Sequence, residues 1–328
     1  DKVFGQKHQA WLRPNKTQDE NMTMRFTRRQ FAASAVAAMT LAALPTRLMA
    51  SSQPFAGGKL HSFSDGSMNL PIESVFYDIF GDDRQKFLKA AQVLDGIWRR
   101  PVNVNLLEIG DRKILFDVGS GINFLPTLGE LPAALDAADV DISAITDVVF
   151  THAHPDHIWG ILDDFDDLLM PDAAYHISQA EWDFWDSDDA VTVMIPGRES
   201  FAVGAKSRFD KLRDQISFFQ GGDEILSGIE AVDTSGHTPG HTSFLIHNSA
   251  GPVLIAGDAL THPVISIEHP EWQNPADMDR EKAAVTRKRL LDRLASEKIG
   301  LAATHLPAPG FGRVEANKSV WRYIAADS

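Results

Sequence analysis

The segment Thr151-His152-Ala153-His154-Pro155-Asp156-His157 follows an apolar run, residues 144–150, that is typical of a buried β-strand. Three histidines and one aspartate fall within six residues, a density that few folding roles require. In an extended segment, residues two apart point to the same side, so His152 and His154 can reach one metal ion. Imidazole nitrogen and carboxylate oxygen both bind zinc. The segment therefore predicts a metal centre at the end of a strand.

Ligand-type residues also follow three later apolar runs. These are His237 in Gly236-His237-Thr238-Pro239-Gly240-His241, Asp258 after residues 253–257, and His305 after residues 300–304. A site for two ions needs such partners, because the first cluster supplies too few ligands. Two divalent ions about 3.5–4 Å apart can share an activated, bridging hydroxide that attacks a carbonyl carbon or a phosphorus atom. The pattern therefore predicts a dinuclear, metal-dependent hydrolase.

The composition excludes some kinds of side-chain chemistry and disfavours some classes of binding partner. A chain of 328 residues fits one large domain or two small ones. The absence of cysteine excludes disulfides, thiolate ligands and cysteine nucleophiles. Residues 1–50 carry eight Lys/Arg and three Asp/Glu, and the remainder carries 23 basic and 42 acidic residues, a net charge of −19. A domain with this much negative charge repels nucleic acid and anionic lipid and favours a small neutral substrate. The alternative is that the charge serves only solubility.

The first fifty residues have the order of an export signal. Arg28-Arg29-Gln30-Phe31 precedes an Ala-rich apolar run that Pro45 ends, and Leu48-Met49-Ala50 offers a small residue for cleavage. This order resembles a twin-arginine signal and predicts a signal peptide over 25–50, export by the twin-arginine machinery, and a periplasmic or secreted protein. The run is too short for a stable membrane span. Residues 1–24 are then an extension or read-through and residues 51–328 one hydrolase domain; an Ala-rich first helix is the alternative.

Strand-like and helix-like patterns alternate along residues 57–325. A hairpin is expected over 102–118, around the Gly110-Asp111 turn. Further strands are expected at 144–150, 173–177, 229–233, 242–247, 252–256 and 299–304, and helices at 124–138, 178–185, 201–215 and 279–296. The last helix is expected to carry Arg287, Lys288 and Arg289 on its solvent side. Hairpins with interleaved helices indicate an α/β protein in which mixed sheets pack on each other and are covered by helices.

The motif order His-x-His-x-Asp-His, Gly-His-Thr-Pro-Gly-His, Gly-Asp and a late His resembles the metallo-β-lactamase superfamily over residues 57–325. The resemblance implies a four-layer αββα sandwich of two mixed β-sheets flanked by helices, with two divalent metal ions at one edge. It implies one ion held by His152, His154 and His237, a second held by Asp156, His157 and His305, and Asp258 as the bridge. Asp258 is also the expected catalytic proton acceptor. Zinc is the expected metal, and manganese, iron and cobalt suit the same ligands.

Within the superfamily the chain most resembles methyl parathion hydrolase and its lactonase relatives. The matching stretches are Asp117-Val118-Gly119, Phe124 to Gly129, Glu181 to Trp185 and Thr304-His305-Leu306. This resemblance implies organophosphate triesters, aryl esters and lactones as substrates. It places Phe124 and Trp185 in the substrate pocket, with Phe201 as a further candidate. Asp117 and His241 are expected to orient other groups from behind the ligands rather than to bind metal.

Other functions fit parts of the pattern. Glyoxalase II, a thioester hydrolase, shares all seven ligands but binds an anionic substrate through basic residues late in its chain. Here only Lys288 and Arg289 are available, and no cationic clamp is expected near the motifs. A non-catalytic zinc-binding protein is the second alternative. Related lactonases often place a tyrosine near the metals, a role that none of Tyr77, Tyr175 and Tyr323 matches in sequence. The oligomeric state stays open, with a homodimer as one option.

Overall fold

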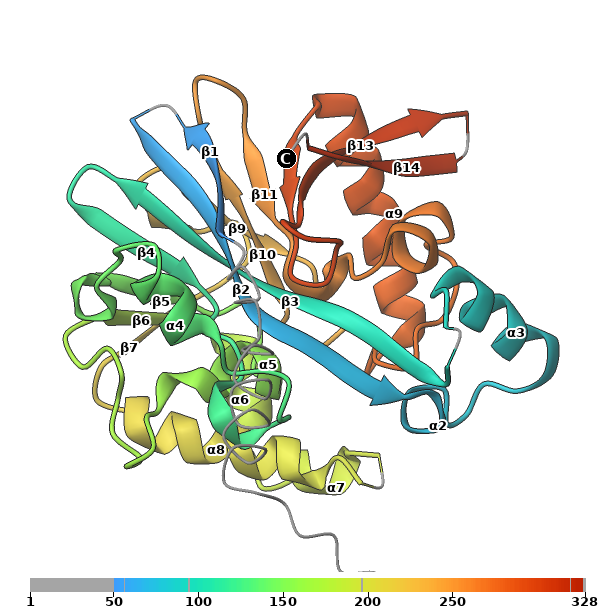
Figure 1. The fold of residues 1–328 in the computed structure, drawn as a ribbon, viewed down its shortest axis with the longest axis horizontal. Coiled ribbons are helices and arrows are strands. Elements are labelled where there is room, and N and C mark those ends of the chain that lie inside the picture. Colours follow the sequence, from blue (N-terminus) through green and yellow to red (C-terminus); the bar gives the residue numbers. More distant parts are fainter. Residues whose placement is uncertain (1–49, 56, 94, 196, 319, 327–328) are drawn as a thin grey trace, which may run out of the picture. The chain divides into compact units, whose positions relative to one another are not determined.

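The computed structural model describes residues 50–55, 57–93, 95–195, 197–318 and 320–326 (Figure 1). The predicted extension over 1–24 and the predicted signal peptide over 25–50 lie outside these residues, except for Ala50. Among the described residues, no helix combines the length and the hydrophobicity that a membrane span requires. The described chain contains two seven-stranded sheets, and both mix parallel and antiparallel neighbours.

The first sheet follows the order of the chain from β1 to β7. Its first four strands form an antiparallel meander, and the next three add in parallel. The strands are β1 (Ala50–Phe55), β2 (Gly58–Pro71), β3 (Ile97–Ile109), β4 (Arg112–Phe116), β5 (Asp147–Val149), β6 (Ala174–Ser178) and β7 (Ile216–Phe219). The hairpin expected over 102–118 is the β3–β4 pair.

The second sheet runs from β14 through to β8. Only its β11–β12 pair is parallel. The strands are β8 (Glu224–Leu226), β9 (Ile229–Asp233), β10 (Thr242–Ile246), β11 (Val253–Ile255), β12 (Gly300–Ala302), β13 (Phe311–Asn317) and β14 (Val320–Ala325). Because β10 is antiparallel to both β9 and β11, strands β9, β11 and β12 all end at one edge of the sheet.

The two sheets pack face to face through one apolar layer. Leu107, Ile114 and Val149 of the first sheet share a cluster with Ile246 and Ile255 of the second. The neighbouring residues Leu106, Leu115 and Val148 belong to a different cluster on the opposite face of the first sheet. This two-residue alternation explains why these strands are apolar almost throughout, since both faces of the sheet are covered.

Helices cover the outer faces and complete the four layers (Figure 1). Leu135, Trp182 and Phe209 come from helices packed on the first sheet, and Leu290, Leu291 and Leu294 from a helix on the second. The helices are α2 (Ile72–Val75), α3 (Gly81–Ala90), α4 (Leu131–Asp136), α5 (Pro155–Ile158), α6 (Gln179–Trp185), α7 (Ala190–Val193), α8 (Glu199–Leu212) and α9 (Arg280–Glu297). The predicted αββα sandwich is confirmed.

Two predictions about helices were wrong in part. The helix expected over 124–138 is confined to α4, which begins only where Pro132 can occupy the first turn. Helix α9 has the expected extent, with Asp279 accepting a hydrogen bond from the Lys282 amide at its start. However, Arg287 does not face solvent: it is 2% exposed. It lies on the buried face with Ala283, Leu290 and Leu294, at the i+4 and i+3 spacings of one helical stripe.

Asp65 of β2 connects the first sheet to residues 117–131, which follow β4, through hydrogen bonds. Its carboxylate accepts hydrogen bonds from the Ser120 amide at 2.9 Å and the Leu131 amide at 3.0 Å. Gly119, with φ of 67°, lies so close that a Cβ there would stand 2.5 Å from the Asp65 carboxyl carbon. Burial raises the pKa of Asp65 to about 6, and the hydrogen bonds from Ser120 and Leu131 offset it only in part.

A buried acid with a raised pKa stabilises the fold when it is protonated and loses that contribution as pH rises. For Asp65 the loss runs from the ordinary pKa of 3.8 through about 6. The unfolding free energy should therefore fall by about 2 kcal/mol more in wild type than in Asp65→Asn between pH 4 and pH 7. Urea denaturation across this range measures it. Asp136→Asn, at an exposed position, should keep the wild-type slope, and parallel curves for wild type and Asp65→Asn would contradict the assignment.

Candidate metal centre

The seven predicted ligand residues converge at the edge where strands β5, β9, β11 and β12 end. Their ligand atoms form three overlapping groups, each within 4.8 Å: His152, His154 and His237; His152, His157 and Asp258; and Asp156, His157 and His305. His152 and His154 lie between β5 and α5, and α5 itself carries Asp156 and His157. Six of the seven residues are buried, and His154 is half-buried.

Asp258 lies between the two halves of the cluster. It sits in the 3₁₀ turn Gly257–Ala259 that follows β11. Its Oδ2 is 3.4 Å from His237 Nε2, whereas its Oδ1 is 3.3 Å from His157 Nε2 and 3.2 Å from His305 Nε2. On the other side of this second group, Asp156 Oδ2 is 3.2 Å from His305 Nε2. The two oxygens of one carboxylate therefore address two separate sets of imidazoles.

Unpaired atoms at the centre show that the donor set fits metal ions. Asp156 Oδ2, His157 Nε2, Asp258 Oδ1 and His305 Nε2 are buried and have no hydrogen-bond partner among the described residues. Buried polar atoms without partners are rare and costly. These four face one another at 3.2–3.4 Å, so a cation between them would satisfy them together. Imidazole and carboxylate with no thiolate is a zinc-type donor set.

The charge states of His152 and Asp258 suit cations. Burial and the neighbouring imidazoles hold the pKa of His152 well below its ordinary value, which keeps it neutral. Burial raises the pKa of Asp258, but His305 and His157 outweigh that effect and keep it well below the ordinary value. Neutral imidazoles and ionised carboxylates are the forms that bind metal. At His157 and His305 burial lowers the pKa, but the neighbouring carboxylates outweigh it and raise the pKa of both rings, so metal binding there would displace a proton.

Hydrogen bonds from behind orient the ligand rings. Asp117 Oδ2 lies 2.8 Å from His157 Nδ1 and also accepts from the Thr151 hydroxyl at 2.8 Å. His305 Nδ1 donates to the Pro101 carbonyl at 2.7 Å. His241 takes no place among the ligand groups of the described residues; its Nε2 accepts the Asp258 amide at 3.0 Å. Asp117 and His241 thus lie behind the ligands, in contact with the His157 ring and the Asp258 backbone amide.

Glu181 of α6 joins two of the ligand loops. It is fully buried and accepts hydrogen bonds from the Ala153 amide, the Thr238 hydroxyl and the Gly240 amide at 2.8–3.0 Å. A Cβ at Gly240 would stand 2.1 Å from the Glu181 nitrogen, so only glycine allows this approach. Sequence reasoning included Glu181 in a matching stretch without giving it this role.

The sequence pattern did not predict the side chains that hold the His237 ring in place. His237 Nδ1 lies 3.0 Å from Asp277 Oδ1, and the other oxygen of Asp277 accepts from Arg287 Nη1 at 2.6 Å. Arg287 also donates to the carbonyls of Pro270 and Trp272. The position of Arg287 on the apolar face of the helix could have predicted this pair, because a buried basic residue requires a buried partner.

A pocket of about 470 Å³ opens onto the ligands His154, Asp156, His237 and Asp258. Phe124 and Phe201 line it, with ring centroids 5.7 Å apart. Trp185 does not line it: its ring is fully buried behind His154, and its Nε1 donates to Glu181 at 2.6 Å. The prediction that Trp185 contacts the substrate is therefore wrong, because its indole serves the support of the ligand loops.

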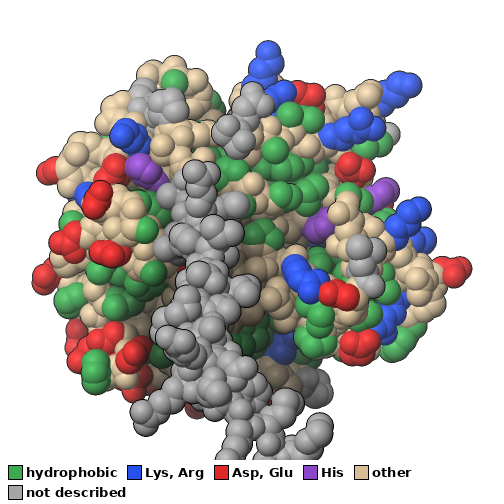
Figure 2. Space-filling view, in the orientation of Figure 1, with side chains coloured by type: hydrophobic (Ala, Val, Ile, Leu, Met, Phe, Trp, Pro, Cys, Tyr) green, Lys and Arg blue, Asp and Glu red, His purple; other side chains and the backbone are tan. Residues whose placement is uncertain are grey.

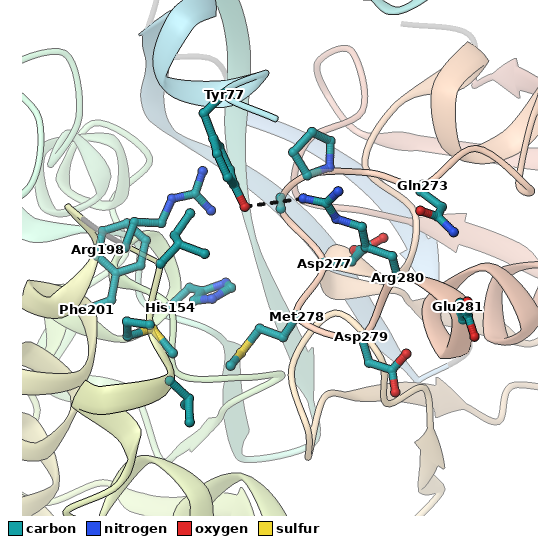
Figure 3. Close-up of a pocket in the computed structure, with 15 residues that line it drawn as sticks. Tyr77, His154, Arg198, Phe201, Gln273, Asp277, Met278, Asp279, Arg280 and Glu281 are labelled. Carbon is teal, nitrogen blue, oxygen red and sulfur yellow. Dashed lines mark hydrogen bonds between the residues drawn. The ribbon is translucent and has the colours of Figure 1, made fainter. Parts of the chain in front are cut away.

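Cationic groups lie near the motifs, contrary to prediction. Arg100 and Arg198 line the pocket together with the ligand carboxylates of Asp156 and Asp258. On the face drawn in Figure 2, Asp and Glu side chains gather over the region of β4–β7 and α4. Figure 3 shows the adjoining pocket, where Arg198 and Phe201 approach from one side and Arg280 from the other. Arg280 donates to the Tyr77 hydroxyl at 3.3 Å (Figure 3). Tyr77, which the sequence left without a role, thus lines both pockets that reach the ligand His154.

The sequence profile of the Metallo-beta-lactamase superfamily matches residues 97–314, which is more than half of the chain. The chain belongs to the metallo-β-lactamase superfamily. Its relatives include a lactonase. An N-acyl homoserine lactonase from a Bacillus species is 38% identical over 81 residues, 24% of this chain and 31% of that protein. The match thus spans less than a third of that relative's length.

Two solved structures of this superfamily share the fold over most of the chain. Hydrolase AbOPH is 24% identical with a TM-score of 0.77, covering 85% of this chain and 98% of its own. AidC, a dizinc quorum-quenching lactonase in complex with its product N-hexanoyl-L-homoserine, is 25% identical with a TM-score of 0.78 and the same coverage.

Asp277 should govern metal affinity through His237. Replacing it with Asn removes the charge that fixes the His237 ring and leaves Arg287 without its carboxylate. We expect Asp277→Asn to weaken zinc binding roughly 10–100-fold, measured by competition with a chromogenic chelator. Asp292→Asn, at an exposed position on α9, the helix that carries Arg287, is the control and should bind zinc as wild type does. Equal affinities in all three proteins would contradict the role of Asp277.

Proposed function

We propose that this protein hydrolyses lactones and related esters with two divalent metal ions, zinc being the best match to the donors. The observation that carries the proposal is Asp258, whose two oxygens address two sets of imidazoles at 3.2–3.4 Å at the floor of an apolar pocket. Manganese, iron and cobalt suit the same ligands. The twin-arginine pattern supports export to the periplasm or beyond.

When bound, two divalent ions would supply an activated water and stabilise negative charge on the substrate. The protein's own residues provide the rest. Asp258 lies where it can accept a proton at the centre of the cluster. Phe124 and Phe201 offer an apolar surface that binds the substituent of the substrate and excludes water from the reacting carbonyl. Glu181, Asp117 and Asp277 keep the ligand loops and rings in place.

Two substrate classes follow from different observations. The lactonase relatives, and the acyl homoserine product bound by AidC, support a lactone with an apolar acyl chain. The edge-on pair of Phe124 and Phe201 supports aryl esters and neutral organophosphate triesters, since aromatic rings favour such packing. A lactone is the primary proposal, because two independent comparisons favour it.

Metal analysis combined with a substrate panel tests the proposal. The purified protein should contain two zinc ions per chain and hydrolyse N-hexanoyl homoserine lactone, dihydrocoumarin or an aryl ester. Exhaustive chelation should reduce turnover to the level of the buffer control, and zinc should restore it. A folded protein that binds fewer than two ions, or keeps its turnover after chelation, would refute the dinuclear mechanism. Full loading without turnover on any ester would instead favour the non-catalytic zinc-binding alternative.

The aromatic lining should determine substrate preference. Phe201→Ala removes the ring that lies 5.9 Å from His154 and should lower kcat/KM about tenfold for a long acyl or aryl substrate. The loss should be much smaller for γ-butyrolactone, which has no substituent to bury. Phe165→Ala, at a surface phenylalanine that is 85% exposed, serves as the control. An equal loss on large and small lactones would show that Phe201 does not bind the substituent.

A further inference from the structure

Arg100 of β3 is a buried arginine without a complete set of partners. It is 6% exposed and lines the pocket together with the ligand Asp258. Its Nε and Nη2 have no hydrogen-bond partner among the described residues. Nη2 lies 3.6 Å from Asp258 Oδ2, beyond hydrogen-bond distance. The guanidinium lies 5.2 Å from the ring centroid of Trp98, two residues earlier on the same face of the strand.

Arg287 is a buried arginine with a structural role, and its hydrogen-bond partners can be compared with those of Arg100. Its guanidinium is equally buried, but it donates to the Asp277 carboxylate and to two backbone carbonyls. Arg100 has no comparable set. The titratable groups around it are Asp258, His305, His262 and Arg198. Burial, with Arg100 nearby, lowers the pKa of His262 to about 4, so this ring is neutral and offers no counter-charge.

The carboxylate of Asp258 does not account for the buried position of the Arg100 guanidinium. Both of its oxygens already address imidazoles at 3.2–3.4 Å, where the proposed metal ions would neutralise its charge. A guanidinium beside two divalent cations is repelled by them at short range. Its position becomes favourable when an anionic oxygen enters the pocket between them. Arginine donors recognise carboxylates in this way, and such charge-assisted hydrogen bonds are the strong ones.

We propose that Arg100 binds the substrate oxygen that becomes negatively charged during hydrolysis and that ends as the carboxylate of the product. This inference rests on the proposed function for the identity of that oxygen. In ring opening, the carbonyl carbon gains the oxygen of water, its bond to the ring oxygen breaks, and that oxygen leaves with a proton. The new acid gives up its remaining proton and becomes a carboxylate. The substrate is neutral, so Arg100 would bind the transition state and product more tightly than the ground state, which raises kcat.

The acidic body and the pocket cations are then compatible. A protein with a net charge of −14 has little affinity for anions at its surface. Arg100 supplies positive charge only at the floor of the pocket, where the anion is formed, and Arg198 lies on the same lining. The substrate can therefore be neutral, as the composition predicts, because the cationic side chains of the pocket bind the anionic product.

The test compares Arg100→Gln with Arg99→Gln in the zinc-loaded protein. Arg99 is the neighbouring residue of β3, but its side chain is 56% exposed and pairs with Asp95. Isothermal titration with hexanoate, which carries a carboxylate and an apolar chain, should show at least tenfold weaker binding in Arg100→Gln and wild-type binding in Arg99→Gln. For the lactone, kcat should fall at least tenfold in Arg100→Gln with a smaller change in KM, while zinc content stays at two ions.

Three results would overturn the inference. The first is an unchanged hexanoate affinity in Arg100→Gln, and the second is a loss of zinc that accounts for the weaker binding. The third is a higher KM for the lactone with an unchanged kcat. If Arg100→Gln does not fold, Arg100→Lys decides, because it keeps the charge but loses the two-pronged donor geometry. Weaker hexanoate binding at full zinc content supports the inference, and wild-type affinity overturns it. A wild-type protein that cleaves no ester but binds hexanoate through Arg100 would refute the proposed function and leave this anion site standing.

Discussion

The carboxylate of Asp258 is the interaction on which the arrangement of this site depends. One oxygen faces His237 and the other faces His157 and His305, so the two ligand sets are joined through a single side chain. Buried polar atoms without partners are costly, and a cation between these groups would satisfy them together. The donor set therefore suits a charge that the polypeptide does not itself provide.

Such a centre requires rigid support, and buried acids provide it. Glu181 links the loops that carry His154 and His237, Asp117 fixes the ring of His157, and Asp277 fixes the ring of His237. Glu181 belongs to α6, Asp117 follows β4, and Asp277 precedes α9, whose Arg287 donates to its carboxylate. The ligand geometry therefore rests on the packing of helices α6 and α9 against the sheets as much as on the ligand loops.

The pocket combines opposite requirements. Phe124 and Phe201 favour an uncharged substituent, whereas Arg100, beside Asp258, favours an anion. Hydrolysis of a neutral ester reconciles the two, because the charge appears only as the reaction proceeds. A charge that appears only during the reaction would account for an incompletely paired arginine inside the pocket of an acidic protein. It also distinguishes Arg100 from Arg287, whose partners are all internal.

The sequence alone predicted the layers, which the structure confirms, and the ligand residues, which the structure brings together, because both are local patterns. Ligand-type residues directly follow apolar strands, and the strand and helix periods are read within ten residues. It could not determine which side chains support the ligands. Asp277 and Arg287 carry no motif, Trp185 resembles a pocket residue until α6 turns it inward, and Arg100 is far in sequence from Asp258. Those roles depend on which elements pack together, and only the tertiary structure determines that packing.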